Sequence, residues 1–182
     1  MGGLSDIPCR FGEVMPPRQA GPTLLATHVD HAPCIAVYLE PMLSDHELLA
    51  RILDRDLIGF LTAVDPSGQP QTAPVWFVRD GDDIVVYNRP DTPRLSSIAV
   101  NPKVALTLRG DRRGMGGVSI EASATRDDSM PSPQDFPGYL DKYRDEIELI
   151  GYTPQAFSVG YGVGVRLVVT RVRAFGLEHF DV

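Results

Sequence analysis

Apolar residues recur along the chain at two different spacings, and turn signals separate the segments. The apolar residues between Leu48 and Leu53 repeat at the spacing of one helical face. The tetrad Ser44-Asp45-His46-Glu47 just before them has the pattern of a capping box, in which the first hydroxyl and the last carboxylate bond each other's backbone amides. The pattern therefore predicts a helix from this box to Asp56.

The segments after this helix are rich in β-branched and aromatic residues, as strands are. Asp65-Pro66-Ser67-Gly68 and Arg79-Asp80-Gly81-Asp82 are predicted hairpin turns, because proline and glycine supply the backbone angles that tight turns need. Six strands are predicted, over Leu57–Val64, Gln69–Val78, Asp83–Asn88, Lys103–Arg109, Val118–Thr125 and Val163–Phe175.

Two more helices are predicted in the second half of the chain. Pro93 suits the first turn of a helix, so a short helix with Thr92 as its cap is expected to run to about Val100. Phe136–Ile150 has one apolar face and is the other helix. Because hairpins join consecutive strands, the predicted fold is α+β but mainly β: a six-stranded antiparallel β-barrel, closed or half-closed, with two or three helices.

Residues 1–40 follow neither spacing. Pairs such as Gly2-Gly3 and Pro16-Pro17 interrupt any regular element. We expect a flexible extension over 1–40, with one short strand near Ile35–Leu39, and one folded domain over 41–182. Since Met42 stands just before the first predicted helix, one hypothesis is that the extension comes from an upstream start codon.

Composition narrows the range of functions. The chain has 182 residues, of which 43% are hydrophobic and 23% are charged. It contains no run of eighteen apolar residues, which is the length needed to span a membrane. The net charge of −7 argues against binding to nucleic acid or to anionic membranes. The only cysteines are Cys9 and Cys34, so we expect no disulfide framework. The N-terminus does not have the pattern of a secretory signal, so we expect a cytoplasmic location. Arginine far outnumbers lysine, which is typical of a GC-rich genome.

Several segments contain residues typical of metal, phosphate or catalytic sites, but none has the complete motif. His28-Val29-Asp30-His31 with Cys34 does not have the spacing of a zinc site, so no metal is expected. Gly110–Gly117 lacks the lysine of a P-loop, and Gly160–Gly164 precedes a strand rather than a helix. Neither a nucleophile elbow nor a cysteine–histidine pair in ordered sequence is found, so no catalytic side chain is predicted.

The segment Gln69–Val104 combines features of a ligand site. Pro74 lies within a predicted strand, which indicates an edge or a bulge with free backbone groups, and Trp76 follows with a large planar surface. Arg89, Thr92 and Arg94 stand around the start of the short helix, where hydroxyls, guanidinium groups and backbone amides favour an anion. The alternative is that Trp76 belongs to the core and the arginines are solvated.

This segment resembles the flavin-binding core of the pyridoxamine-phosphate-oxidase-like split-barrel superfamily, and more closely its coenzyme F420-dependent oxidoreductases. The resemblance is carried by Pro74-Val75-Trp76-Phe77, Asp80-Gly81, Tyr87-Asn88, the Thr92/Arg94 loop, Asn101-Pro102-Lys103-Val104 and the helix with Tyr139-Leu140-Asp141-Lys142-Tyr143. It implies an FMN-binding-like split barrel. The family often has lysine at the position of Arg94, and Ser96-Ser97 replace a more basic stretch.

The resemblance also implies a cofactor site and an activity. The cofactor ring would be lined by Gln71, Thr72, Ala73, Pro74, Val75 and Trp76, with Tyr87 and Asn88 in the same site, and the phosphate would be held by Thr92 and Arg94 with help from Arg89. The implied protein is a homodimeric F420-dependent oxidoreductase with the cofactor between its subunits. It would pass a hydride between the cofactor and an unsaturated small-molecule substrate.

Two alternatives stay open: an FMN-binding oxidoreductase of the same fold, and a non-enzymatic carrier of flavin or haem. The phosphate and glutamate tail of F420 require a local basic patch despite the acidic total charge. The candidates for that patch are Arg89, Arg94, Lys103, Arg112 and Arg113.

Overall fold

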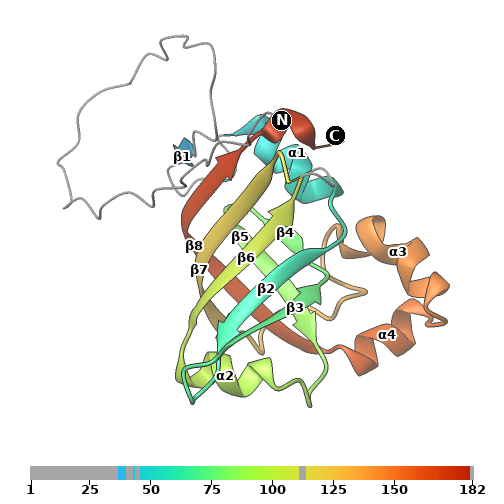
Figure 1. Cartoon of the computed structure of the whole chain (residues 1–182). Helices are drawn as coiled ribbons and strands as arrows, with labels where there is room; N and C mark the ends of the chain where they lie inside the picture. Colours follow the sequence, from blue (N-terminus) through green and yellow to red (C-terminus); the bar gives the residue numbers. More distant parts are fainter. Residues whose placement is uncertain (1–36, 40–42, 44–45, 111–113, 181–182) are drawn as a thin grey trace, which may run out of the picture. The chain divides into compact units, whose positions relative to one another are not determined.

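One antiparallel sheet of eight strands organises the chain (Figure 1). The computed structural model describes residues 37–39, 43, 46–110 and 114–180. Seven strands follow the order β3-β2-β6-β7-β8-β5-β4, and β1 pairs with β8 beside this path. The strands are β1 (Val37–Leu39), β2 (Gly59–Val64), β3 (Pro70–Val75), β4 (Val78–Asp80), β5 (Asp83–Asn88), β6 (Lys103–Arg109), β7 (Gly117–Arg126) and β8 (Val163–Phe175).

The expectation of a six-stranded barrel was wrong in strand number, and the sheet is not closed. The short strand near Ile35–Leu39 is β1, and the strand expected over Gln69–Val78 is two strands, β3 and β4, interrupted at Trp76-Phe77. These two strands form opposite ends of the path, where β3 pairs with β2 and β4 with β5. The interruption lets one stretch of chain contribute to both edges of the sheet.

Two side chains from a distant helix stabilise this interruption. The Phe77 amide donates to the Tyr143 hydroxyl at 2.8 Å, and the Phe77 carbonyl oxygen lies 2.8 Å from the same hydroxyl. The Lys142 ammonium also donates to the Phe77 carbonyl, at 3.0 Å. Buried backbone groups need hydrogen-bond partners, and here two side chains replace the missing strand neighbour.

The described helices are α1 (Glu47–Arg55), α2 (Arg94–Val100), α3 (Tyr139–Leu149), α4 (Pro154–Gly160) and the 3-10 turn η2 (Leu177–His179). The first helix begins later than predicted: its N-cap is His46, which makes no side-chain capping bond, and Ser44 lies outside the described residues. The α4 helix was not predicted. Its Thr153 cap accepts a hydrogen bond from the Ala156 amide, with Pro154 in the first turn. No helix in the described part of the chain is long and apolar enough to cross a membrane.

Two hydrophobic clusters share strand β5. Ile84 and Val86 belong to the cluster formed by the inner sheet face and α1, whereas Val85 and Tyr87 pack with α3 and α4. Almost every residue of β5 is therefore buried, because both faces of this strand are covered. Figure 1 shows α3 and α4 together on one side of the sheet. They form one wall of the pocket described next.

Candidate functional site

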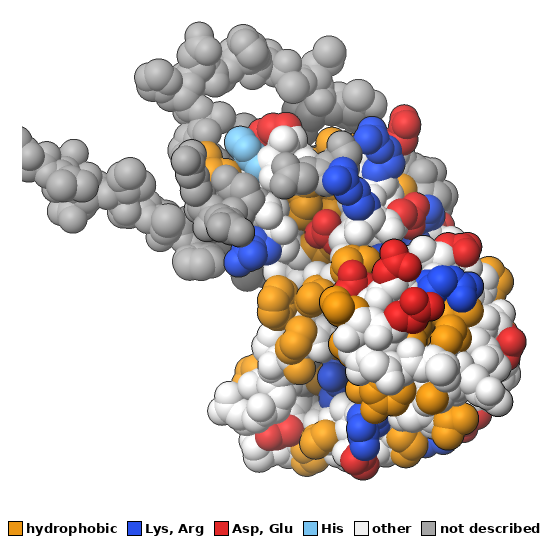
Figure 2. Space-filling model, turned by 90° about the vertical axis from the view of Figure 1, so that its right-hand side faces the viewer, with side chains coloured by type: hydrophobic (Ala, Val, Ile, Leu, Met, Phe, Trp, Pro, Cys, Tyr) orange, Lys and Arg blue, Asp and Glu red, His pale blue; other side chains and the backbone are white. Residues whose placement is uncertain are grey.

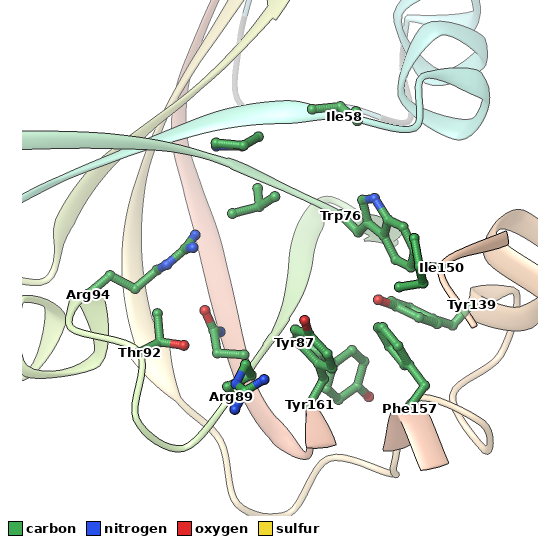
Figure 3. Close-up of a pocket in the computed structure, with 13 residues that line it drawn as sticks. Ile58, Trp76, Tyr87, Arg89, Thr92, Arg94, Tyr139, Ile150, Phe157 and Tyr161 are labelled. Atoms are coloured by element: carbon green, nitrogen blue, oxygen red, sulfur yellow. The ribbon is translucent and has the colours of Figure 1, made fainter. Parts of the chain in front are cut away.

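A pocket of about 290 Å³ lies where the ends of β3 and β5, the start of α2 and the α3–α4 pair meet (Figure 3). Its lining residues are Ile58, Pro74, Val75, Trp76, Tyr87, Asn88, Arg89, Thr92, Arg94, Tyr139, Ile150, Phe157 and Tyr161. Two groups of side chains stand on different sides of the cavity. We call Arg89, Thr92 and Arg94 the arginine end, and Trp76, Tyr139, Phe157 and Tyr161 the aromatic end.

Arg94 is the distinctive group of the arginine end. Its side chain starts at the first residue of α2, and Figure 3 shows its guanidinium pointing into the cavity. The Nη1 atom is buried and has no hydrogen-bond partner among the described residues, and burial lowers the pKa of this guanidinium. Leaving a buried charged donor unpaired is costly, so the geometry favours an anionic ligand at this atom.

The neighbouring groups of the arginine end are more exposed. The Arg89 Nε atom lies 3.3 Å from an Asp91 carboxylate oxygen, which raises the pKa of Arg89, and its guanidinium is 6.0 Å from the centre of the Tyr161 ring. Thr92 was expected to cap α2, but the N-cap is Pro93, and no side-chain capping bond is formed there. The Thr92 hydroxyl is thus not used as a cap and lines the pocket instead.

The aromatic end is a continuous stack of rings. Trp76 stacks on Tyr143 at a centroid distance of 4.9 Å and on Phe157 at 5.5 Å. Phe157 in turn stacks on Tyr161 at 4.5 Å, with an interplanar angle of 11°. Stacked pairs stabilise by about 0.5–1.5 kcal/mol each beyond the area they bury. This wall is therefore rigid, flat and apolar, and suited to a planar ligand.

Three tyrosine hydroxyls near the pocket differ in their hydrogen bonding. The Tyr87 hydroxyl donates to the Pro131 carbonyl at 2.5 Å, and burial raises the pKa of Tyr87 to about 12. The Tyr143 hydroxyl is occupied by backbone groups of Phe77 and Leu57. The Tyr139 hydroxyl makes no hydrogen bond to any described residue, and Figure 3 shows it directed into the cavity.

The structure brings together most of the predicted site. Among the predicted residues, those from Pro74 onwards line the pocket: Pro74, Val75, Trp76, Tyr87, Asn88, Arg89, Thr92 and Arg94. The other three predicted residues, which precede Pro74 on β3, do not line the pocket: Gln71, Thr72 and Ala73. The Thr72 hydroxyl is 2.8 Å from that of Thr62 on the neighbouring strand, so it is used within the sheet.

Other residues of the pocket were not predicted. They are Ile58, Tyr139, Ile150, Phe157 and Tyr161. Phe157 and Tyr161 stand four residues apart around α4, so the Thr153-Pro154 start signal of that helix would have pointed to them. Lys103 is exposed at the start of β6 and does not line the pocket, while Arg112 and Arg113 lie outside the described residues.

Metal binding finds no support among the described residues. Within that part of the chain, no three His, Cys, Asp or Glu side chains gather as a metal site would require. The His28–Cys34 segment considered from the sequence lies outside the described residues.

Comparison with known proteins identifies the family. Residues 45–174 match the family model described as pyridoxamine 5'-phosphate oxidase. The chain belongs to the pyridoxamine 5'-phosphate oxidase family. The match extends from α1 to β8 and so includes every wall of the pocket. No curated protein matches the sequence.

Solved structures share the fold of this family member. A conserved hypothetical protein from Mycobacterium tuberculosis is 19% identical with a TM-score of 0.61, covering 76% of this chain and 89% of that one. An F420 reductase is 25% identical with a TM-score of 0.50, covering 66% and 90%. A FAD-binding protein from Mesorhizobium loti is 16% identical with a TM-score of 0.52, covering 78% and 97%. The family model confirms the predicted superfamily, and solved proteins named for different cofactors share its fold.

Proposed function

We propose that this protein is an oxidoreductase that binds coenzyme F420 in the described pocket. The observation that carries the proposal is the buried, unpartnered Nη1 of Arg94, opposite a wall of stacked aromatic rings. A planar ring system joined to a phosphate has the chemistry that these two ends would recognise. Family membership and the 25% identity to an F420 reductase support the same conclusion.

The residues of the pocket fit such a cofactor. Arg94 would pair with the phosphate, with the Thr92 hydroxyl and Arg89 beside it. Strand β3 ends the sheet path and no described strand pairs with its outer edge, so backbone groups near Pro74 and Val75 could meet a planar ring. When bound, the cofactor supplies hydride transfer, which agrees with a pocket whose described lining contains no Ser, Cys, His, Lys or carboxylate side chain.

The second candidate is FMN, and one observation favours it. The side chains that follow Arg94 bring no further positive charge: Ser96 donates to the Pro93 carbonyl at 2.7 Å, and Ser97 is buried. A single phosphate would suffice for this arginine end, whereas the glutamate tail of F420 would have to find its partners elsewhere.

We also propose that the protein is a homodimer with the cofactor between its subunits. Phe60 is exposed on β2 between Pro74 of β3 and Thr107 of β6, so an uncharged patch adjoins the pocket wall. Sedimentation equilibrium should show a dimer, and Phe60→Glu should weaken it. A wild-type monomer at micromolar concentrations would contradict this part of the proposal.

The cofactor is tested by titrating the purified chain in parallel with F420, FMN and haem, then following reoxidation of the reduced cofactor with an α,β-unsaturated ketone. We expect F420 to bind most tightly and its reduced form to be consumed only when the ketone is present. FMN binding without F420 binding would replace the leading candidate with the second. Binding of any ligand without turnover of a panel of acceptors would favour a carrier.

A further inference from the structure

A second cavity, of about 310 Å³, lies between α1, β4 and the start of α3. None of its lining residues lines the pocket that contains Arg94; they are Asp54, Val78, Arg79, Pro137, Gly138, Asp141 and Lys142. Two carboxylates and two cationic groups balance the formal charge of this lining. Figure 2, which looks onto the side of α3 and α4, likewise shows acidic and basic side chains mingled rather than a patch of one sign. The second cavity therefore suits a polar but uncharged ligand.

The amine of Lys142 has no carboxylate partner among the described residues. Its Nζ atom donates to the Leu53 carbonyl at 2.7 Å and to the Phe77 carbonyl at 3.0 Å, and the Phe77 ring lies 4.0 Å away. The carboxylate of Asp54 is bonded instead to Arg79, at 2.9 and 3.1 Å. An ammonium has three N–H groups, whereas a neutral amine has two and a lone pair. The two carbonyl partners therefore satisfy a neutral amine and leave its lone pair for the second cavity.

The charges that face Lys142 do not keep it an ammonium at every physiological pH. Asp54 near the end of α1 and Asp56 just after it both favour the charged amine. Burial outweighs them and lowers the pKa of Lys142 to about 8. The neutral fraction of this amine near pH 7.5 is therefore far larger than that of an exposed lysine. Because the neutral amine is the nucleophilic form, the surroundings of Lys142 favour a covalent reaction.

We propose that Lys142 is a covalent attachment site for a small hydroxyaldehyde. The lone pair of Nζ forms a bond to the aldehyde carbon, and the two amine protons leave with the carbonyl oxygen as water. The product is an imine, and nothing is oxidised or reduced. A proton from solvent then restores one N–H, which can return to a backbone carbonyl. The site is separate from the proposed cofactor pocket and does not depend on it.

The second cavity favours a hydroxyaldehyde over other carbonyl compounds. The Asp141 carboxylate lines the cavity one residue before Lys142, is exposed, and pairs with no described residue. A carboxylate is an acceptor only, so it would bind a ligand hydroxyl group. An aldehyde with a carboxylate or phosphate of its own would be repelled by Asp141 and Asp54. The guanidinium of Arg79 is already bonded to Asp54 and offers such an anion little compensation.

The lysine content of the chain allows the reaction to be followed on the unmodified protein. Lys103 and Lys142 are the only lysines, and Lys103 is exposed at the start of β6, so it is an internal control. The probes are glyceraldehyde and propanal, which have three carbons each but differ in their hydroxyl groups. Cyanoborohydride traps the imine as a stable amine, and peptide mapping by mass spectrometry measures the label at each lysine and at the α-amino group.

We expect Lys142 to be labelled about ten times faster than Lys103 at pH 7.5, because its larger neutral fraction outweighs its weaker intrinsic nucleophilicity. Labelling of Lys142 by glyceraldehyde should saturate as the aldehyde concentration rises, whereas labelling of Lys103 should stay proportional to it. Propanal should react at Lys142 without saturation. Equal rates at the two lysines, or a Lys142 rate that is linear in glyceraldehyde, would overturn the proposal.

A pair of variants tests the choice of ligand. Asp141→Ala should raise the glyceraldehyde concentration for half-maximal labelling of Lys142 by about three- to tenfold, since a hydrogen bond to a carboxylate is lost. Its rate with propanal should stay the same. Asp145→Ala, which removes an exposed carboxylate of the same helix outside the cavity, should change neither quantity. Equal glyceraldehyde curves for wild type and Asp141→Ala would contradict the assignment of a hydroxyaldehyde.

Discussion

The two ends of the pocket are built in opposite ways. At the arginine end, Nη1 of Arg94 is buried and no described residue pairs with it, and its neighbours Arg89 and Thr92 come from the short segment just before α2. At the aromatic end, rings from the β3–β4 interruption, from α3 and from α4 with the residue that follows it are packed against one another. The first end is costly to the fold until a ligand binds, whereas the second stabilises the fold whether a ligand is present or not. Mutations should therefore separate binding from stability.

Removing a ring from the aromatic stack should have the largest effect of the set, and this effect should be on the free energy of unfolding. Phe157 is buried and contacts Trp76, Tyr152 and Tyr161. Phe157→Ala should lower the free energy of unfolding by about 3–5 kcal/mol, through lost burial and the cavity left behind. Urea denaturation measures the change, with Leu149→Ala as the control because Leu149 is 80% exposed. Equal losses in the two variants would mean that the stack does not stabilise the fold.

Arg94→Ala should show the reverse pattern. We expect the affinity for the phosphate-bearing cofactor to fall by about 1.5–3 kcal/mol, because a charge-assisted contact is removed. The free energy of unfolding should stay unchanged or rise, since a buried donor atom without a partner among the described residues is lost. Arg126→Ala, an exposed arginine paired with Asp128, is the control for binding. A destabilised Arg94 variant with normal affinity would reverse our assignment of this end.

Lys142 contacts the Phe77 carbonyl and the Tyr143 ring beside the aromatic end, and it should make the free energy of unfolding depend on pH. Burial lowers its pKa to about 8, although Asp54 and Asp56 act in the other direction. The folded protein then loses this proton before the unfolded chain does, so unfolding takes up a proton between pH 8 and 10. Stability from this group should therefore rise by about 2 kcal/mol across that range.

The Lys142 prediction is checked by urea denaturation at several pH values between 8 and 10. Lys142→Met should remove the rise, and the difference in slope between the two proteins isolates this group from others. Above pH 10 the raised pKa of Tyr87 acts in the opposite direction, because the unfolded chain then deprotonates first. A wild-type slope equal to that of the variant would show that Lys142 titrates normally.

Arg89→Ala should have the smallest effect of the set. This side chain is exposed and already paired with Asp91, so its contribution to binding is screened by water. We expect a loss of cofactor affinity several times smaller than that of Arg94→Ala, and more sensitive to salt. Titrations at low and high ionic strength measure both quantities. A loss of affinity as large as that of Arg94→Ala would show that the phosphate lies nearer to Arg89 than we propose.

The arginine end was predictable from the sequence because its residues are neighbours in the chain. Arg89, Thr92 and Arg94 fall within six positions, and the turns at Asp65 and Gly81 were equally local: Asp65 accepts from the Ser67 and Gln69 amides, and Gly81 has a φ of 64°. Turn chemistry depends on residues close in sequence, so patterns reveal it.

The aromatic end was not predictable in the same way. The break at Phe77 depends on Tyr143, which lies 66 positions further along the chain, so the pattern of strand residues gave no sign of it. Tyr139 and Phe157 reach the pocket only because α3 and α4 cover β5. Each ring has the pattern of an ordinary core residue, and tertiary packing alone shows which of them line a cavity.

The central claim is that this pocket binds a flavin-type cofactor with its phosphate on Arg94, and one titration tests it most directly. Trp76 lines the pocket and is the only tryptophan, so F420 added to the wild-type chain should quench its fluorescence in a saturable manner, with one site per chain. Arg94→Ala should shift the midpoint to about ten- to hundredfold higher concentration. Saturable binding that leaves Trp76 fluorescence unchanged, or an Arg94→Ala curve superimposed on that of wild type, would contradict the account.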